Sequence, residues 1–194
     1  YADAKDSLVA VDVNIPVTSD GYSVALKKGN TELTEFVNGV LEDLKEAGKK
    51  VVGIYCTFVP TELVEAAGGA TVTLCASSEE PIPAAENHLP RNLCPLIKAS
   101  YGFALQDTCP YFYFSDFIVG ETTCDGKKKM FELMNEIKET YVMQLPSSRD
   151  EAALDAWEKE VVRFWKKIED FYGITISEED VKKAIELKNK ERDV

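Results

Sequence analysis

The chain has 194 residues, of which 45% are hydrophobic, enough for a packed domain of ordinary size. Its 34 acidic and 22 basic side chains give a net charge of -12, which argues against nucleic acid or an anionic membrane as a partner, because both need a basic surface. No apolar run approaches the roughly 18 residues of a membrane span, and the first residues lack a signal-peptide pattern, so a cytoplasmic chain is expected.

Residues 1–48 contain two predicted strands and a helix. The runs 8–16 and 22–28 are rich in β-branched and apolar residues and are separated by a turn. The apolar residues from Leu33 to Leu44 recur at helical spacing. Gly48 is the expected residue just after the end of this helix.

From residue 49 to 148, strands and helices alternate. The expected strands are 50–56, 70–75, the second half of 111–123, and 140–146; the expected helices are 60–68, 92–105 after Pro95, and 124–139. This alternation predicts an α/β fold, a Rossmann-like lobe with a parallel sheet and helices on both faces. In such sheets ligands bind beyond the carboxyl ends of the strands.

Residues 149–194 form a predicted C-terminal helical segment. One amphipathic helix covers 150–172 and ends at Gly173, and a second covers 177–192 with Ser177 as its N-cap. The second helix has no closing signal, so the chain is expected to be part of something larger.

The chain has five cysteines, an odd number that fits a disulfide framework poorly, and no two form a C-x-x-C motif. Cys56 and Cys75 each end a predicted strand, and Cys124 follows a third strand and begins a helix. We therefore expect these three thiols at one rim of the sheet. The single histidine, His88, is predicted to lie in a loop, which leaves no histidine-rich metal site.

Two interpretations of the thiols follow from their spacing. Free cysteines are often small buried hydrophobic residues. Alternatively, they are thiolate ligands of an iron–sulfur cluster. A helix N-terminus favours a thiolate because backbone N–H groups and the helix dipole stabilise the anion. Cys124 has this position, with Lys127–Lys129 one turn further on.

Four stretches resemble the 2-hydroxyacyl-CoA dehydratase D-component family, and most closely its double-cubane cluster branch. The resemblance covers about residues 49–192 and corresponds to the N-terminal lobe of that family. Its motifs are "VVGIYCTFVPTELVEAAGG", "LPRNLCPLIKASYGFAL", "TCPYFYFSDFIVGETTCDGKKKMFELM" and "VMQLP".

This resemblance implies an oxygen-sensitive iron–sulfur protein with a 4Fe-4S or double-cubane cluster. It implies Cys56, Cys94 and Cys124 as ligands of the cluster iron, and gives less reason to include Cys75 and Cys109. It also implies an ATP-hydrolysing activator protein and a second dehydratase-type subunit or lobe, giving a dimer. The chemistry would be dehydration of a 2-hydroxyacyl-CoA, a lyase reaction, or reduction of a small substrate.

Residues 1–47 instead resemble the C-terminal segment of amino-acid-binding proteins of ABC transporters, so the chain is interpreted as chimeric. Two other functions are therefore kept open. The chain is either a folded, catalytically inactive fragment without a cluster, or a fragment of an amino-acid-binding protein.

Several charged residues near the predicted rim have two interpretations each. Glu62 is a catalytic acid or base, or a first-turn glutamate that complements a helix dipole. Lys127–Lys129 contact the phosphates of coenzyme A or an acidic partner, or form a solvated helix face. Asp116 and Glu121 flank the strand before Cys124 and are also explained as polar strand ends.

Overall fold

The structure, a computed structural model, describes residues 8–12, 23–27, 32, 48–74, 76 and 78–192. The chain forms two compact units, Tyr1–Lys49 and Lys50–Val194. In the first unit, β1 (Leu8–Asp12) pairs antiparallel with β2 (Ser23–Lys27), which confirms both predicted strands. The predicted helix from Leu33 to Leu44 lies outside the described residues. Gly48 has a φ of 57°, the left-handed conformation expected just after a helix.

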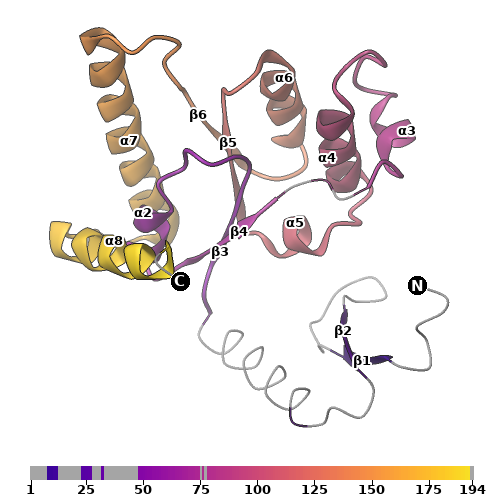
Figure 1. The fold of residues 1–194 in the computed structure, drawn as a ribbon, viewed down its shortest axis with the longest axis horizontal. Helices are drawn as coiled ribbons and strands as arrows, with labels where there is room; N and C mark the ends of the chain where they lie inside the picture. Colours follow the sequence, from indigo (N-terminus) through magenta and orange to yellow (C-terminus); the bar gives the residue numbers. More distant parts are fainter. Residues whose placement is uncertain are drawn as a thin grey trace. The chain divides into compact units, whose positions relative to one another are not determined.

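The second unit contains a four-stranded parallel sheet with the order β4-β3-β5-β6 (Figure 1). The strands are β3 (Val51–Ile54), β4 (Ala70–Thr73), β5 (Phe117–Glu121) and β6 (Thr140–Met143). Strands that are neighbours in a parallel sheet need crossover connections, which the intervening helices provide. The predicted α/β fold is confirmed.

Helices cover both faces of this sheet because alternate strand residues point to opposite sides. Phe117 and Val119 of β5 belong to one core and Ile118 to the other. The core with Phe117 also contains residues of α2 (Thr61–Ala66), α7 (Glu151–Tyr172) and α8 (Glu178–Arg192). The opposite core contains residues of α3 (Ile82–Ala85), α4 (Pro95–Leu105), α5 (Pro110–Phe114) and α6 (Asp125–Met134), as Figure 1 shows.

The two C-terminal helices have the expected ends. The side chain of Asp150 accepts a hydrogen bond from the backbone N–H of Ala153, 2.8 Å away, and Gly173 ends α7 with a φ of 70°. Ser177 and Asp180 exchange hydrogen bonds at the start of α8, with the Asp180 N–H donating to Ser177 Oγ at 3.1 Å. This reciprocal pair is a capping box with aspartate in the usual place of glutamate.

Two short helices, α3 and α5, are not among the predicted elements. In α5, Pro110 opens the helix, and the Cys109 thiol accepts a hydrogen bond from the N–H of Phe112 at 3.5 Å. At its other end, Lys138 Nζ donates to three backbone carbonyls, which include those of Phe112 at 2.7 Å and Ser115 at 2.5 Å. The aromatic run of α5 is thus helical because its ends are capped.

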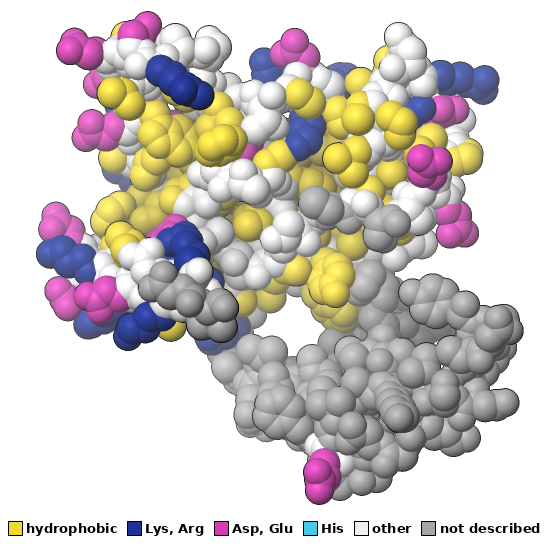
Figure 2. Space-filling model, in the orientation of Figure 1, with side chains coloured by type: hydrophobic (Ala, Val, Ile, Leu, Met, Phe, Trp, Pro, Cys, Tyr) yellow, Lys and Arg dark blue, Asp and Glu magenta, His cyan; other side chains and the backbone are white. Residues whose placement is uncertain are grey.

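The surface of the second unit is mixed in character. Figure 2 shows charged side chains around the periphery of the visible face and hydrophobic side chains between α7 and the strands. Among the residues that the structure describes, no helix combines the length and apolar character that a membrane span requires.

Candidate functional site

Cys56 lies in a constrained loop just beyond β3. The strand ends at Ile54, and Cys56 has a φ of 72°, a left-handed conformation that is rare for residues other than glycine. Such a conformation costs about 1–3 kcal/mol and needs support from its surroundings. The support comes from Glu121 at the end of β5, whose Oε1 accepts the N–H of Phe58 at 2.6 Å and of Val59 at 2.9 Å.

Glu121 is a buried carboxylate. Its side chain has 0% exposure, and among the described residues no donor bonds its second oxygen, Oε2. Burial raises the pKa of Glu121, while the two backbone hydrogen bonds and the charge of Lys127 partly oppose this shift. A group of this kind beside a thiol loop is a candidate functional residue.

Lys127 connects the Cys56 loop to the start of α6. Its Nζ donates a hydrogen bond to Cys56 Sγ, and Thr123 Oγ1 lies 3.6 Å from the same sulfur. Burial lowers the pKa of Lys127, but the hydrogen bond to Cys56 and the electrostatic interactions with Cys56, Cys124 and Glu121 outweigh this effect and raise it overall. Lys127 therefore stays cationic beside the thiol, where it can stabilise a thiolate.

Cys94 and Cys124 are the N-cap residues of α4 and α6, and both are exposed free thiols whose side chains make no capping hydrogen bond. The two helix starts are in contact at Gly126. A Cβ on Gly126 would lie 2.8 Å from Cδ1 of Leu93, the residue before Cys94, and 2.8 Å from Cδ1 of Ile97 in the first turn of α4. The absence of a side chain at Gly126 is what permits this close approach.

Contacts link the first turn of α6 to the Cys56 loop and to the start of α4. Cys124 is the N-cap residue directly before this turn. Cys56 accepts a hydrogen bond from Lys127, which lies in the turn. Gly126, also in the turn, packs against the start of α4, where Cys94 is the N-cap residue. Cys109 is separate, because its thiol caps α5 and packs against the core. Cys75 lies outside the described residues.

The described side chains do not form a site for a single metal ion. Within the described part of the chain, no group of three or more His, Cys, Asp or Glu side chains is arranged to hold one ion.

The other charged residues singled out in the sequence mostly have ion-pair partners. Lys128 pairs with Asp125 at 3.0 Å and Lys129 with Glu132 at 2.9 Å, both on the exposed face of α6. Such surface pairs contribute little stability. Glu62 accepts a hydrogen bond from Arg192 at 2.5 Å. Its side chain is only 17% exposed.

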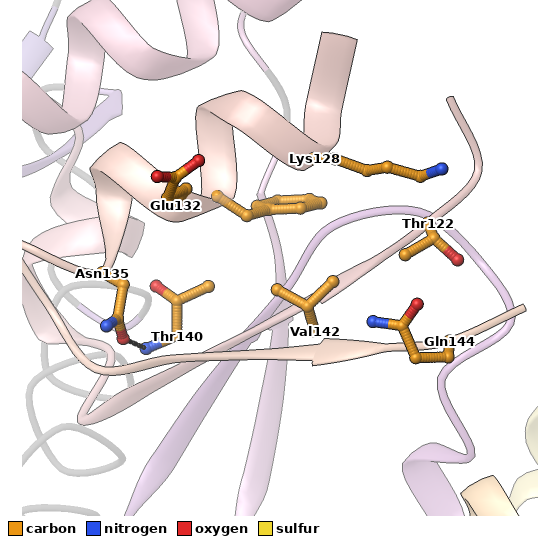
Figure 3. Close-up of a pocket in the computed structure, with 8 residues that line it drawn as sticks. Thr122, Lys128, Glu132, Asn135, Thr140, Val142 and Gln144 are labelled. Carbon is orange, nitrogen blue, oxygen red and sulfur yellow. Dashed lines mark hydrogen bonds between the residues drawn. The ribbon is translucent and has the colours of Figure 1, made fainter. Parts of the chain in front are cut away.

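A polar pocket of about 410 Å³ lies between α6 and β6 (Figure 3). Thr122, Lys128 and Gln144 lie at one end, while Asn135 and Thr140 lie at the other. At the end with Asn135, the Thr140 N–H donates to Asn135 Oδ1 at 2.8 Å. The end with Thr122 adjoins the segment that leads to Cys124.

The contacts of Lys127 and Glu121 with the Cys56 loop are absent from the sequence predictions. The Lys127–Cys56 pair spans 71 positions, and the Glu121–Phe58 bond spans 63. The sequence offered one indication of these contacts, which is that Glu121 and Lys127 lie three residues before and three residues after Cys124. Acidic strand ends and lysines in the first turn of a helix are common, so this indication was weak.

The fold and the rim define a class of protein, an α/β lobe that presents free thiols at helix starts beyond the carboxyl ends of a parallel sheet. The chain belongs to the family described as 2-hydroxyglutaryl-CoA dehydratase, D-component, which matches residues 56–194. This confirms the resemblance stated from the sequence motifs.

Two relatives are subunits of dehydratases by name. The chain is 58% identical to the Escherichia coli (strain K12) protein named "Putative dehydratase subunit YjiM", over 92% of the chain and 45% of that protein. It is 26% identical to the (R)-phenyllactyl-CoA dehydratase beta subunit of Clostridium sporogenes, over 80% of the chain and 41% of the subunit. The chain thus spans less than half the length of these relatives.

The E. coli match covers more of the chain than residues 49–194 contain, so it also includes part of the first 48 residues. The similarity of residues 1–47 to amino-acid-binding proteins stays a prediction.

Proposed function

We propose that this chain is the thiol-bearing lobe of an iron–sulfur protein of the 2-hydroxyacyl-CoA dehydratase type. In this proposal Cys56, Cys94 and Cys124 bind a 4Fe-4S or double-cubane cluster. The observation that supports the proposal is that the first turn of α6, which follows Cys124, contacts both the Cys56 loop and the helix start that carries Cys94. Family membership supports it independently.

The chain's own residues would bind the cluster and balance its charge. Three thiolates bring negative charge to the rim, and Lys127 provides a cation beside Cys56. Thr123 lies close enough to hydrogen-bond the same sulfur, and hydrogen bonds to ligand sulfurs help to set reduction potential. When bound, an iron–sulfur cluster supplies electrons one at a time, which is the chemistry that removal of an unactivated hydroxyl group needs.

The proposed partners follow from the family and its relatives. They are an ATP-hydrolysing activator, a second dehydratase-type subunit or lobe, and an acyl-CoA or small unsaturated substrate. The Clostridium relative is named as a phenyllactyl-CoA dehydratase subunit, which favours an acyl-CoA as the first substrate class to test. A reducing cytoplasm is the proposed location, because it keeps the thiols free.

Glu62 is proposed only as a secondary acid or base at the same rim. Its carboxylate is held by Arg192, so a proton-transfer role requires that this pair opens when substrate binds. Replacement of Arg192 by methionine would release Glu62 without changing the thiols.

The proposal is tested by anaerobic reconstitution of the chain with iron and sulfide, followed by desalting. The expected product is brown, with broad visible absorption and with iron and sulfide bound in equal amounts. A folded product that is colourless and free of iron would contradict the proposal and support the cluster-free alternative. Calorimetric titration with amino acids tests the remaining alternative, for which heat of binding would be the supporting result.

A further inference from the structure

The end of β5 ties three loops of the rim together. Glu121 bonds the backbone of the Cys56 loop, and the Leu145 N–H donates to Thr122 Oγ1 at 2.8 Å. Thr123 contacts the sulfur of Cys56 itself, 3.6 Å away. The three residues before Cys124 thus connect its helix to the loops that follow β3 and β6.

We infer that Glu121 is a positioning residue that fixes Cys56 relative to Cys124. Its Oε1 holds two consecutive N–H groups of the loop at 2.6 and 2.9 Å, two and three residues beyond Cys56. With these bonds in place, Cys56 keeps its left-handed backbone and points its sulfur toward Lys127. The inference rests on the proposed function, because the placement of Cys56 relative to Cys124 matters when both are ligands of one cluster.

Stability alone does not explain a carboxylate at this place. The side chain is fully buried, and a buried polar oxygen without a donor lowers stability. What the carboxylate provides is one acceptor oxygen that two consecutive amides share, at 2.6 and 2.9 Å. The geometric constraint is therefore the benefit that offsets the burial.

Asp116, directly before β5, provides a matched control for Glu121 at the end of the same strand. Asp116, just before β5, accepts the N–H of Val51 on its Oδ2 at 2.7 Å, so it ties β3 to β5 at the amino end of the strands. Asp116 is exposed and lies at the opposite end of the sheet from the rim thiols. A change at Asp116 loosens the same strand pair without touching the Cys56 loop.

The test measures how readily Cys56 and Cys124 are joined by dibromobimane, a short reagent that becomes fluorescent when it links two thiols. The full metal-free chain is used, and peptide mapping identifies the linked pair. We expect Glu121→Ala to slow this cross-link about tenfold, because the loop loses the hydrogen bonds from the amides of Phe58 and Val59 to Glu121. Glu121→Asp, which retracts the carboxylate by one methylene, slows it too and serves if the alanine variant does not fold.

Two further variants make the result specific. Glu121→Gln retains an acceptor oxygen at the same reach and is expected to restore most of the wild-type rate, and Asp116→Ala is expected to leave the rate unchanged. Hydrogen exchange should show faster exchange at the amides of Phe58 and Val59 in the alanine variant only.

The inference is overturned if Glu121→Ala and Glu121→Asp keep the wild-type cross-linking rate. It is also overturned if Asp116→Ala slows the reaction equally, because the effect would then be a general loosening of the fold, or if Glu121→Gln is as slow as the alanine variant. Iron loading is measured separately on each variant. A wild-type chain that cross-links as expected but takes up no iron would contradict the proposed function and leave the positioning role of Glu121 intact.

Discussion

At the scale of single residues, the rim combines a buried carboxylate, a cation and free thiols within one network. Lys127 interacts electrostatically with Cys56, Cys124 and Glu121 together. Cys56 pairs with Lys127 from a backbone conformation that costs free energy. Strain of this kind concentrates where function requires a fixed geometry.

Tyr172 gives a prediction for the pH dependence of stability. Burial raises its pKa to about 12, and its hydroxyl donates to the Lys50 carbonyl at 3.1 Å. An exposed tyrosine titrates near pH 10, so the contribution of Tyr172 to folding is complete below about pH 10 and is lost as the pH rises toward 12. The free energy of unfolding should therefore fall in this range.

The Tyr172→Phe variant isolates this contribution from those of other tyrosines. It should lose about 1 kcal/mol at pH 7 with the hydrogen bond, and the gap between it and the wild type should close between pH 10 and 12. Urea unfolding at a series of pH values measures both effects, with Tyr111→Phe as the control at an exposed tyrosine. A gap that stays constant up to pH 12 would contradict the assignment.

At the scale of elements, hydrophobic periodicity and the positions of glycine and proline predicted most of the second unit. The alternation of apolar strands and helices predicted the parallel sheet. The helical spacing of apolar residues predicted α7, with its ends at Asp150 and Gly173. The aromatic run of α5 was missed because tyrosine and phenylalanine favour strands, whereas Lys138, distant in sequence, caps this helix. The place of Cys124 between β5 and α6 was predictable from local order, but the contact between α6 and the Cys56 loop depends on residues that are distant in sequence.

Helix α7 provides a prediction of packing energy. Phe164 is fully buried between α7 and the sheet, in contact with the core that contains Phe117 and Val119. Phe164→Ala should lower the free energy of unfolding by about 3–5 kcal/mol, because it removes a large buried side chain and leaves a cavity. Leu154→Ala on the same helix, at 65% exposure, should change it by no more than about 0.5 kcal/mol.

Chemical denaturation of the two variants gives this comparison directly. A similar loss of stability in both would mean that α7 does not pack on the sheet through its Phe164 face. A small loss in both would mean that the helix contributes little to the second unit.

At the scale of the whole molecule, the chain holds one α/β unit of the dehydratase D-component family and a second compact unit before it. The family match begins at Cys56, the first thiol of the proposed ligand set. Because the chain spans less than half of its relatives, the complete reaction is proposed for an assembly that includes further protein. The binding of a cluster by these thiols is the part of the account that this chain can test.

The most direct measurement compares two multiple variants after anaerobic reconstitution with iron and sulfide. One replaces the proposed ligands Cys56, Cys94 and Cys124 by serine, and the other replaces only Cys75 and Cys109. Iron per chain and the electron paramagnetic resonance of the reduced samples are recorded for both and for the wild type. The account predicts that the triple variant loses the iron and the signal, whereas the double variant retains both. Equal iron and an unchanged signal in the triple variant would contradict it.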